Sequence, residues 1–251
     1  MQPSGRRGVP LREQVRIVHE DDDLVVVEKP AGLLTIATPK ERKRTLYAFL
    51  WDHVKARDSG RRIFIVHRLD REASGLLVLA KSLEAKQALQ EQFRQRRAGR
   101  AYLARVEGAY PQDSETLRSY LAENAAFRVY STDGRRGRLA VTHVRVVQRD
   151  GGTTLLEARL ETGRKHQIRV QLAERGHPVV GDSRYGSGGT GRSRLALHAA
   201  SLSFVHPRTG KTLEFRSRAP AWLRAPGAPP PAKRPPPASY SGPRRRAPRR
   251  R

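Results

Sequence analysis

Apolar and polar positions alternate along much of the chain with a period of two, which predicts more strands than helices. Residues 15–20 and 24–29 flank three consecutive aspartates and predict a β-hairpin. Residues 45–55 carry apolar side chains at helical spacing, and Ser82 is a good N-cap for a second helix that runs to about Arg97 and is ended by Gly99. Further strands are predicted over residues 63–66, 75–80 and 100–107.

The second half of the chain gives a weaker pattern. Residues 139–148 and 153–160 predict another hairpin, residues 166–174 predict a short helix, and two or three short strands follow between 195 and 215. Residues 111–138 are polar and poorly patterned, so we expect a region rich in loops. Helices are interspersed among the strands without βαβ alternation, which indicates an α+β fold with a mostly antiparallel, mixed central sheet flanked by helices and loops.

Composition divides the chain into three regions. Residues 1–14 are polar and contain Gly, Pro and Arg, so we expect a flexible arm, and residues 15–224 are expected to form a single domain. Residues 225–251 consist mainly of Pro, Ala, Arg and Lys with no acidic residue, which predicts a disordered basic tail.

The charge of the chain points to a polyanionic partner. Lys and Arg together number 50 against 24 Asp and Glu, a formal net charge of +26. No apolar run is long enough to cross a membrane, and the N-terminus does not resemble a signal peptide. A membrane-surface protein would need an amphipathic helix with a broad apolar face, and the sequence predicts none. Cysteine is absent, which excludes disulfides and thiol catalysis and fits a cytoplasmic protein.

Residues 67–81 place a dense charge cluster directly before an apolar strand. Asp70 is the only carboxylate among residues 67–71, and the neighbouring Arg68 and Arg71 favour its ionised form. An ionised and partly desolvated carboxylate can attack an electrophilic carbon. The alternative interpretation is a solvated surface turn.

A second cationic segment covers residues 160–172. A strand ends near Gly163, and the predicted helix that follows brings Arg164, Lys165 and Arg169 close to amide donors. This combination suits phosphate or carboxylate binding, although a basic helix face on a basic protein would look the same. The eight histidines are scattered without the spacing of metal ligands, so we expect no metal site.

Five ordered segments resemble the RluA-type RNA pseudouridine synthases. These are H-R-L-D at 67–70, H-Q-I-R at 166–169, Y-L-A-R-V-E-G at 102–108, V-V-V-E-K-P-A-G at 25–32 and L-H-A-A-S-L-S-F-V-H-P at 197–207. The resemblance runs from about residue 15 to 222 and implies that residues 15–224 are a pseudouridine synthase catalytic domain. Many family members also carry an N-terminal S4-type RNA-binding domain, and with about 14 residues before the first strand we expect that module to be absent.

The resemblance also implies roles for single residues. Asp70 would act on the target uridine, Arg169 would form a salt bridge to Asp70, and Arg68 would fill the space left by the flipped-out nucleotide. Tyr102 and Ile168 would hold the uracil between them. Lys29 and Pro30 would form the floor of the site, and His67 would either contact RNA or form a structural hydrogen bond.

The predicted function is therefore isomerisation of specific uridines to pseudouridine in ribosomal or transfer RNA stem-loops, without a cofactor and by a monomer. Uracil leaves C1′, rotates and rejoins through C5, and Asp70 serves either as the nucleophile at C1′ or as the base for a 2′ proton. One alternative is a non-catalytic RNA-binding or ribosome-assembly protein. Another is a glycosidase or nucleosidase, which would normally need two carboxylates at a set separation.

Deletion of residues 225–251 tests the contribution of the tail to RNA binding. The tail carries eight Lys and Arg residues, so its loss should lower RNA affinity and reduce the dependence of affinity on salt concentration. Turnover of a short stem-loop at saturating RNA should persist. Titrations at several salt concentrations, together with single-turnover rates, measure both effects, and loss of turnover at saturation would contradict the prediction.

Overall fold

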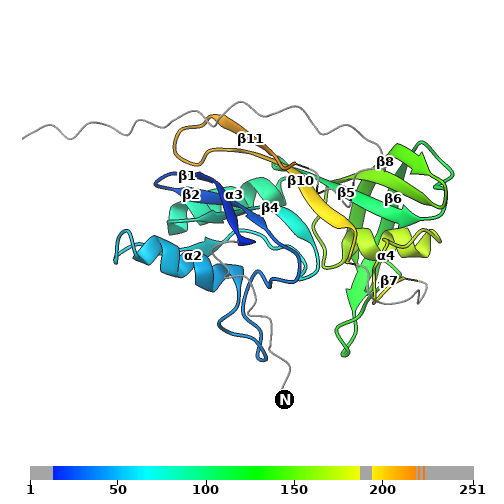
Figure 1. The fold of residues 1–251 in the computed structure, drawn as a ribbon, viewed down its shortest axis with the longest axis horizontal. Helices are drawn as coiled ribbons and strands as arrows, with labels where there is room; N and C mark the ends of the chain where they lie inside the picture. Colours follow the sequence, from blue (N-terminus) through cyan, green and yellow to red (C-terminus); the bar gives the residue numbers. More distant parts are fainter. Residues whose placement is uncertain (1–13, 187–193, 219, 221–222, 224–251) are drawn as a thin grey trace, which may run out of the picture.

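The computed structural model describes residues 14–186, 194–218, 220 and 223. Within these ranges the strands form one eleven-stranded sheet in the order β1-β2-β4-β10-β5-β9-β8-β6-β7, with β11 beside β10 and β3 beside β4 (Figure 1). Paired strands run antiparallel except β10 and β4, which are parallel. The predicted α+β fold with a mostly antiparallel, mixed sheet is confirmed.

The elements have the following bounds. The helices are α2 (Leu46–Lys55), α3 (Leu83–Arg94) and α4 (Gln167–Glu174). The strands are β1 (Arg16–Glu20), β2 (Leu24–Lys29), β3 (Phe64–Ile65), β4 (Ser74–Ala80), β5 (Gly99–Glu107), β6 (Ser114–Glu123), β7 (Val129–Thr132), β8 (Arg138–Asp150), β9 (Thr153–Leu160), β10 (Leu197–Val205) and β11 (Thr212–Arg216).

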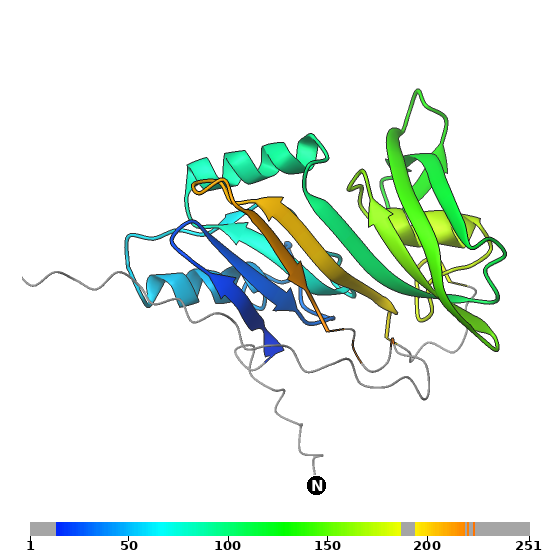
Figure 2. The same cartoon turned by 90° about the horizontal axis from the view of Figure 1, so that it is seen from above.

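Strands β2 and β4 are buried on both faces. Successive side chains of a strand point to opposite faces, so Val25 and Val27 pack in the cluster that contains Leu46 of α2, while Val26 packs in the cluster that contains Leu89 of α3. Figure 2 shows α2 and α3 on the two sides of this part of the sheet. The continuous apolar runs of both strands follow from this two-sided cover.

The helix starts are confirmed, whereas one helix end differs from the prediction. Ser82 Oγ accepts a hydrogen bond from the amide of Ala85 at 3.0 Å, as expected for an N-cap. Helix α3 ends at Arg94, before the expected Arg97, and the backbone turns at Arg96 with φ of 60°. Gly99 therefore does not end the helix but begins β5.

The expectation of a loop-rich region over residues 111–138 is wrong. This region forms β6 and β7, which extend the sheet beyond β8. Strand β6 buries Leu117 and Leu121 while most of its other side chains are at least partly exposed, so its apolar pattern is too sparse to predict a strand. The predicted strand over residues 63–66 is also shorter, because β3 contains only Phe64 and Ile65.

Gly75 permits the single parallel pairing. Its φ is +115°, and a Cβ placed there would lie 2.3 Å from the carbonyl oxygen of Ala199 in β10. Only glycine fits this close approach of two backbones. Because Gly75 lies five residues after Asp70, the pairing also fixes where the chain that follows Asp70 enters β4.

A buried ammonium holds the segment that follows Asp70. Lys29 is fully buried, and Nζ donates to the carbonyl oxygens of Pro30 (3.0 Å), Leu33 (2.8 Å), Arg71 (3.2 Å) and Ala73 (2.7 Å). Burial lowers the pKa of Lys29 to about 7, against the opposing field of Asp70 and Glu72. The carbonyl oxygens replace the water that a buried ammonium would lose.

The described residues contain no helix long and apolar enough to cross a membrane. Most of the predicted arm and the whole basic tail lie outside the described residues, so those two predictions stay predictions.

Replacement of Lys29 by Met tests the role of this ammonium. The variant leaves four buried or partly buried carbonyl oxygens without their donor, and we expect the free energy of unfolding to fall by about 3 kcal/mol or more. Urea denaturation followed by tryptophan fluorescence measures the loss. The exposed Lys40→Met variant is the control and should unfold like the wild type; equal midpoints for all three proteins would contradict the prediction.

Candidate active site

Asp70 lies in the segment between β3 and β4, four residues before β4 begins. Thr35 fixes this segment, because its hydroxyl donates to the carbonyl of Leu69 at 2.9 Å and accepts from the Leu69 amide at 3.3 Å. Leu69 is buried, whereas the Asp70 side chain is 21% exposed. The carboxylate is therefore held by its backbone and still reaches solvent.

Helix α4 brings a buried cation to this carboxylate. Arg169 Nε and Nη2 donate to the two carboxylate oxygens of Asp182 at 2.7 and 2.8 Å, and Nη1 donates to Asp70 Oδ2 at 3.3 Å. The side chains of Arg169 and Asp182 are 3% and 0% exposed. Burial alone would lower the pKa of Arg169, but the hydrogen bonds and charges of Asp182 and Asp70 raise it. The guanidinium is thus a permanent positive charge beside Asp70.

Asp182, which lies thirteen residues after Arg169, was assigned no role from the sequence. Burial would raise the pKa of its carboxyl group, yet the hydrogen bond and charge of Arg169 lower it. Its Oδ1 also accepts from the amides of Arg184 and Tyr185 at 2.9 and 3.1 Å. Only the tertiary structure shows that the bidentate partner of Arg169 is Asp182, and that the contact with Asp70 is the longer one.

Two buried glutamines anchor α4 to β8. Gln167 Nε2 donates to the Val141 carbonyl at 3.0 Å and to Thr142 Oγ1 at 2.8 Å, while Gln171 Oε1 accepts from Thr142 Oγ1 at 2.7 Å. Helix α4 begins at Gln167, so Arg164 and Lys165 precede it and do not lie on its face. The position of Arg169 follows from these polar anchors.

His166 and Tyr185 form a second layer beside Asp70. His166 has a left-handed backbone with φ of 52°, and its Nε2 lies 3.9 Å from Asp70 Oδ1. Its Nδ1 lies 2.8 Å from the Tyr185 hydroxyl, which also accepts from the amide of Val129 at 3.2 Å. Burial lowers the pKa of His166 although Asp70 opposes this, so the ring is neutral near pH 7.

A cavity of about 450 Å³ opens beside Asp70. Its walls include Tyr102 of β5 and Ile168 of α4, which are 8% and 4% exposed, together with the exposed Arg68. Burial raises the pKa of Tyr102, so its phenol is neutral. The cavity thus offers an aromatic and an aliphatic side chain for apolar contact with a bound group, next to a carboxylate.

Of three further residues that the sequence predicted for the site, two line the cavity and one does not. His67 lines the cavity, but its Nε2 accepts from the Val78 amide at 3.3 Å, its ring lies 4.6 Å from that of Phe93, and burial lowers its pKa to about 3. Arg164 also lines the cavity and donates from Nε to the Leu139 carbonyl at 3.1 Å. Lys165 does not line this cavity; it faces a neighbouring hollow and pairs with Glu123.

Arg100 is a cavity residue that the sequence interpretation left out. Its guanidinium lies 5.2 Å from the Phe93 ring, and burial lowers its pKa. Among the buried side-chain nitrogen and oxygen atoms that the structure describes, Arg100 Nε is the one without a hydrogen-bond partner. It stands two residues before Tyr102, and no spacing rule separates it from the many other arginines.

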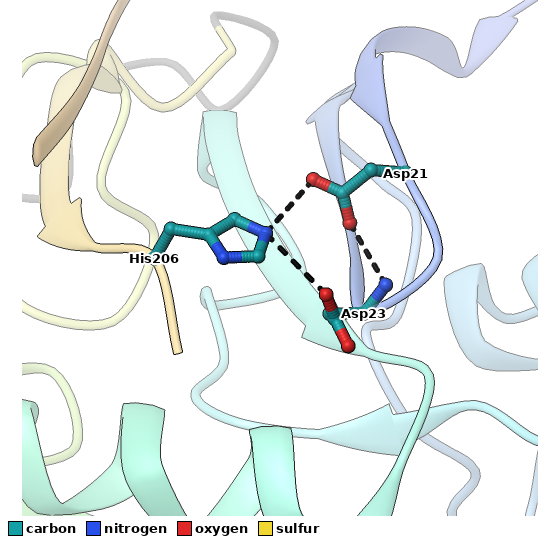
Figure 3. Close-up of side chains that lie close together, drawn as sticks. All are labelled: Asp21, Asp23 and His206. Atoms are coloured by element: carbon teal, nitrogen blue, oxygen red, sulfur yellow. Dashed lines mark hydrogen bonds and ion pairs between the residues drawn. The ribbon is translucent and has the colours of Figure 1, made fainter. Parts of the chain in front are cut away.

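Asp21, Asp23 and His206 lie close together, with possible ligand atoms within 4.8 Å of one another, as in a metal site (Figure 3). However, His206 Nδ1 accepts from the backbone amides of Arg208 and Thr209 at 3.2 and 3.1 Å. Nε2 then carries the ring hydrogen and donates to Asp21 Oδ2 at 3.1 Å, so it has no lone pair for a metal. These hydrogen bonds indicate that the cluster links the β1–β2 turn to the β10–β11 turn and is not a metal site.

The fold is that of pseudouridine synthases. The human RNA pseudouridylate synthase domain containing 4 superposes with a TM-score of 0.69 at 23% identity, covering 83% of this chain and 90% of that one. The human RNA pseudouridylate synthase domain containing 1 gives 0.66 at 27% identity and 86% coverage of each chain. Residues 23–174 match the RNA pseudouridylate synthase family, and the chain belongs to that family.

Curated relatives agree with this assignment. The chain is 38% identical over 225 residues to the ribosomal large subunit pseudouridine synthase D of Neisseria meningitidis, across 84% of this chain and 60% of the relative. It is 38% identical over 208 residues to the uncharacterized RNA pseudouridine synthase YlyB of Bacillus subtilis, across 81% of this chain and 69% of the relative. The chain therefore spans less than two thirds of the length of the Neisseria relative.

The two carboxylates around Arg169 should differ in their effect on stability. Asp182→Asn leaves a buried guanidinium without its main counter-charge, and we expect the free energy of unfolding to fall by about 3 to 5 kcal/mol. Asp70→Asn removes one longer contact of a partly exposed group, so a change within about 1 kcal/mol is expected. Urea unfolding of both variants beside the wild type measures the difference. Equal losses of unfolding free energy would contradict the conclusion that Asp182 is the main partner of Arg169.

Proposed function

We propose that this chain isomerises uridine to pseudouridine in RNA, with Asp70 as the catalytic residue. One observation carries the proposal: a buried guanidinium contacts a partly exposed carboxylate that lines a cavity together with Tyr102 and Ile168. The family to which the chain belongs supports the same reaction class.

The cavity accounts for binding of the base. A uridine stacked in RNA cannot reach a carboxylate inside the protein, so the nucleotide must be flipped out of its stack. Tyr102 and Ile168 then contact the two faces of the uracil, in the way that aromatic and apolar side chains hold unstacked bases. Arg68, exposed at the rim, occupies the space that the flipped nucleotide leaves.

Asp70 performs the chemical step in either of two routes. As a nucleophile it attacks C1′ while the bond from C1′ to N1 breaks, which gives an ester between Asp70 and C1′; as a base it removes the 2′ proton while the same bond breaks, so that uracil leaves and the sugar becomes a glycal. Uracil then rotates and forms the bond from C5 to C1′, which displaces the Asp70 carboxylate in the first route and is accompanied by return of the proton from Asp70 to C2′ in the second. Loss of the proton from C5 and gain of one at N1 complete the pseudouridine. Substrate and product have the same atoms, so no co-reactant is consumed, and both routes use the Asp70 carboxylate beside Arg169.

The substrate class follows from charge and relatives. A net charge of +26 suits a polyanion, and the name of the Neisseria relative refers to the large ribosomal subunit. We propose structured ribosomal RNA as the substrate, with transfer RNA stem-loops as the second choice. Cytoplasmic location and a monomeric state belong to the same proposal.

Asp70→Asn tests the activity. It should lower turnover on the order of 1,000-fold or more at saturating RNA while RNA affinity changes little, because the carboxylate acts in the reaction and not in phosphate binding. Carbodiimide-based mapping of pseudouridine, on ribosomal RNA from cells that lack the gene, measures sites gained with each protein.

Glu72→Gln is the matched control. Its carboxylate also lies near Arg169, 3.6 Å from Nη1, but its side chain is 50% exposed. This variant should retain most of the turnover. Sites formed equally by wild type and Asp70→Asn would refute the assignment of Asp70, and no site with any protein would favour a non-catalytic RNA-binding role.

A further inference from the structure

Phe127 is an exposed aromatic side chain beside the candidate active site. It lies in the turn between β6 and β7, and its exposed fraction of 68% is larger than that of Leu83, Tyr120, Tyr130 or Val147. A ring so exposed contributes little to the core, and burial does not explain its presence here.

The backbone at Phe127 is strained. Its φ is 56°, in the left-handed region that glycine and asparagine adopt far more readily than an aromatic residue. The turn is well formed: the Phe127 amide donates to the Asn124 carbonyl at 2.9 Å, and Asn124 Oδ1 accepts from the Arg128 amide at 2.9 Å. The turn therefore keeps the ring exposed despite an unfavourable backbone, which is typical of functional positions.

One cation lies near the ring and a second contacts the backbone of Phe127. Lys165 Nζ lies 5.4 Å from the ring centroid, and Arg184 Nη1 donates to the Phe127 carbonyl at 3.0 Å. Glu123 pairs with Lys165 and partly offsets its charge. An exposed aromatic face next to Lys and Arg is the arrangement with which proteins bind unpaired nucleotides, one group stacking on the base and the others contacting phosphate.

Phe127 also shares a hollow with Asp70. This hollow, of about 430 Å³, is lined by Phe127, Lys165, Arg68, Arg169 and Asp70. It is the same hollow that Lys165 faces, adjacent to the cavity proposed for the uracil. A strand of RNA whose target nucleotide lies at Asp70 would pass over Phe127 with a neighbouring nucleotide.

We propose that Phe127 is a stacking platform for an unpaired base that flanks the target uridine, with Lys165 and Arg184 contacting the adjacent phosphates. The proposal rests on the proposed function for the position of the target nucleotide. It assigns the β6–β7 turn a role in RNA recognition. It predicts that the ring of Phe127 increases the affinity for RNA that carries bases and does not change the affinity for an abasic strand of equal charge.

Phe127→Asn removes the ring and supplies a residue that tolerates the left-handed backbone. Affinity is measured by fluorescence anisotropy with two labelled probes, decauridylate and an abasic RNA strand of the same length and charge. A stacked base is worth a factor of roughly 5 to 140 in affinity, so the variant should bind decauridylate more weakly by that factor. Its affinity for the abasic strand, and the salt dependence of both affinities, should equal those of the wild type, because no charge changes.

Two controls complete the test. The melting temperature of Phe127→Asn should equal or exceed that of the wild type, since the strain is relieved. Tyr130→Ser removes another exposed ring of the same hairpin, outside the hollow, and should leave both affinities unchanged.

Three results would each overturn the proposal: an equal loss of affinity for both probes, no loss of affinity for decauridylate, or a marked drop in the melting temperature of Phe127→Asn. The measurement needs no turnover, so its failure is distinct from a failure of the Asp70→Asn experiment.

Discussion

The site depends on the buried guanidinium of Arg169. A charge removed from water needs partners of opposite sign. Arg169 has two: Asp182, thirteen residues further along the chain, and Asp70, in the segment before β4. The bidentate bond to Asp182 satisfies most of the cation, which leaves Asp70 with one longer contact and an open face. The same interaction thus joins two parts of the fold and leaves a carboxylate available for chemistry.

The surroundings of Asp70 are built from polar groups held inside the fold. The Lys29 ammonium donates hydrogen bonds to four carbonyl oxygens, and the Thr35 hydroxyl forms hydrogen bonds with the Leu69 backbone. Gln167 links α4 to β8 by hydrogen bonds. Such groups are tolerated inside a protein only when their hydrogen bonds are made. They position the carboxylate more narrowly than apolar packing would, because hydrogen bonds are directional.

Strained backbone and an unpartnered polar atom occur among the residues around Asp70. Two of the non-glycine residues with positive φ, His166 and Phe127, lie beside Asp70 or share a hollow with it, and the unpartnered Nε belongs to Arg100 in the cavity wall. The Asp21, Asp23 and His206 group differs, because each of its three side chains has a hydrogen-bond or ionic partner.

The sequence alone determined the elements whose signals are local. Strand β2 shows its burial in a continuous apolar run, Ser82 shows a helix start, and the H-R-L-D and H-Q-I-R segments indicate the family. It did not determine β6 and β7, because a strand that buries only Leu117 and Leu121 resembles a loop until β8 lies beside it. The pairing of Asp182 with Arg169 and the shared hollow of Phe127 and Asp70 depend on how separate segments fold together, so only the tertiary structure decided them.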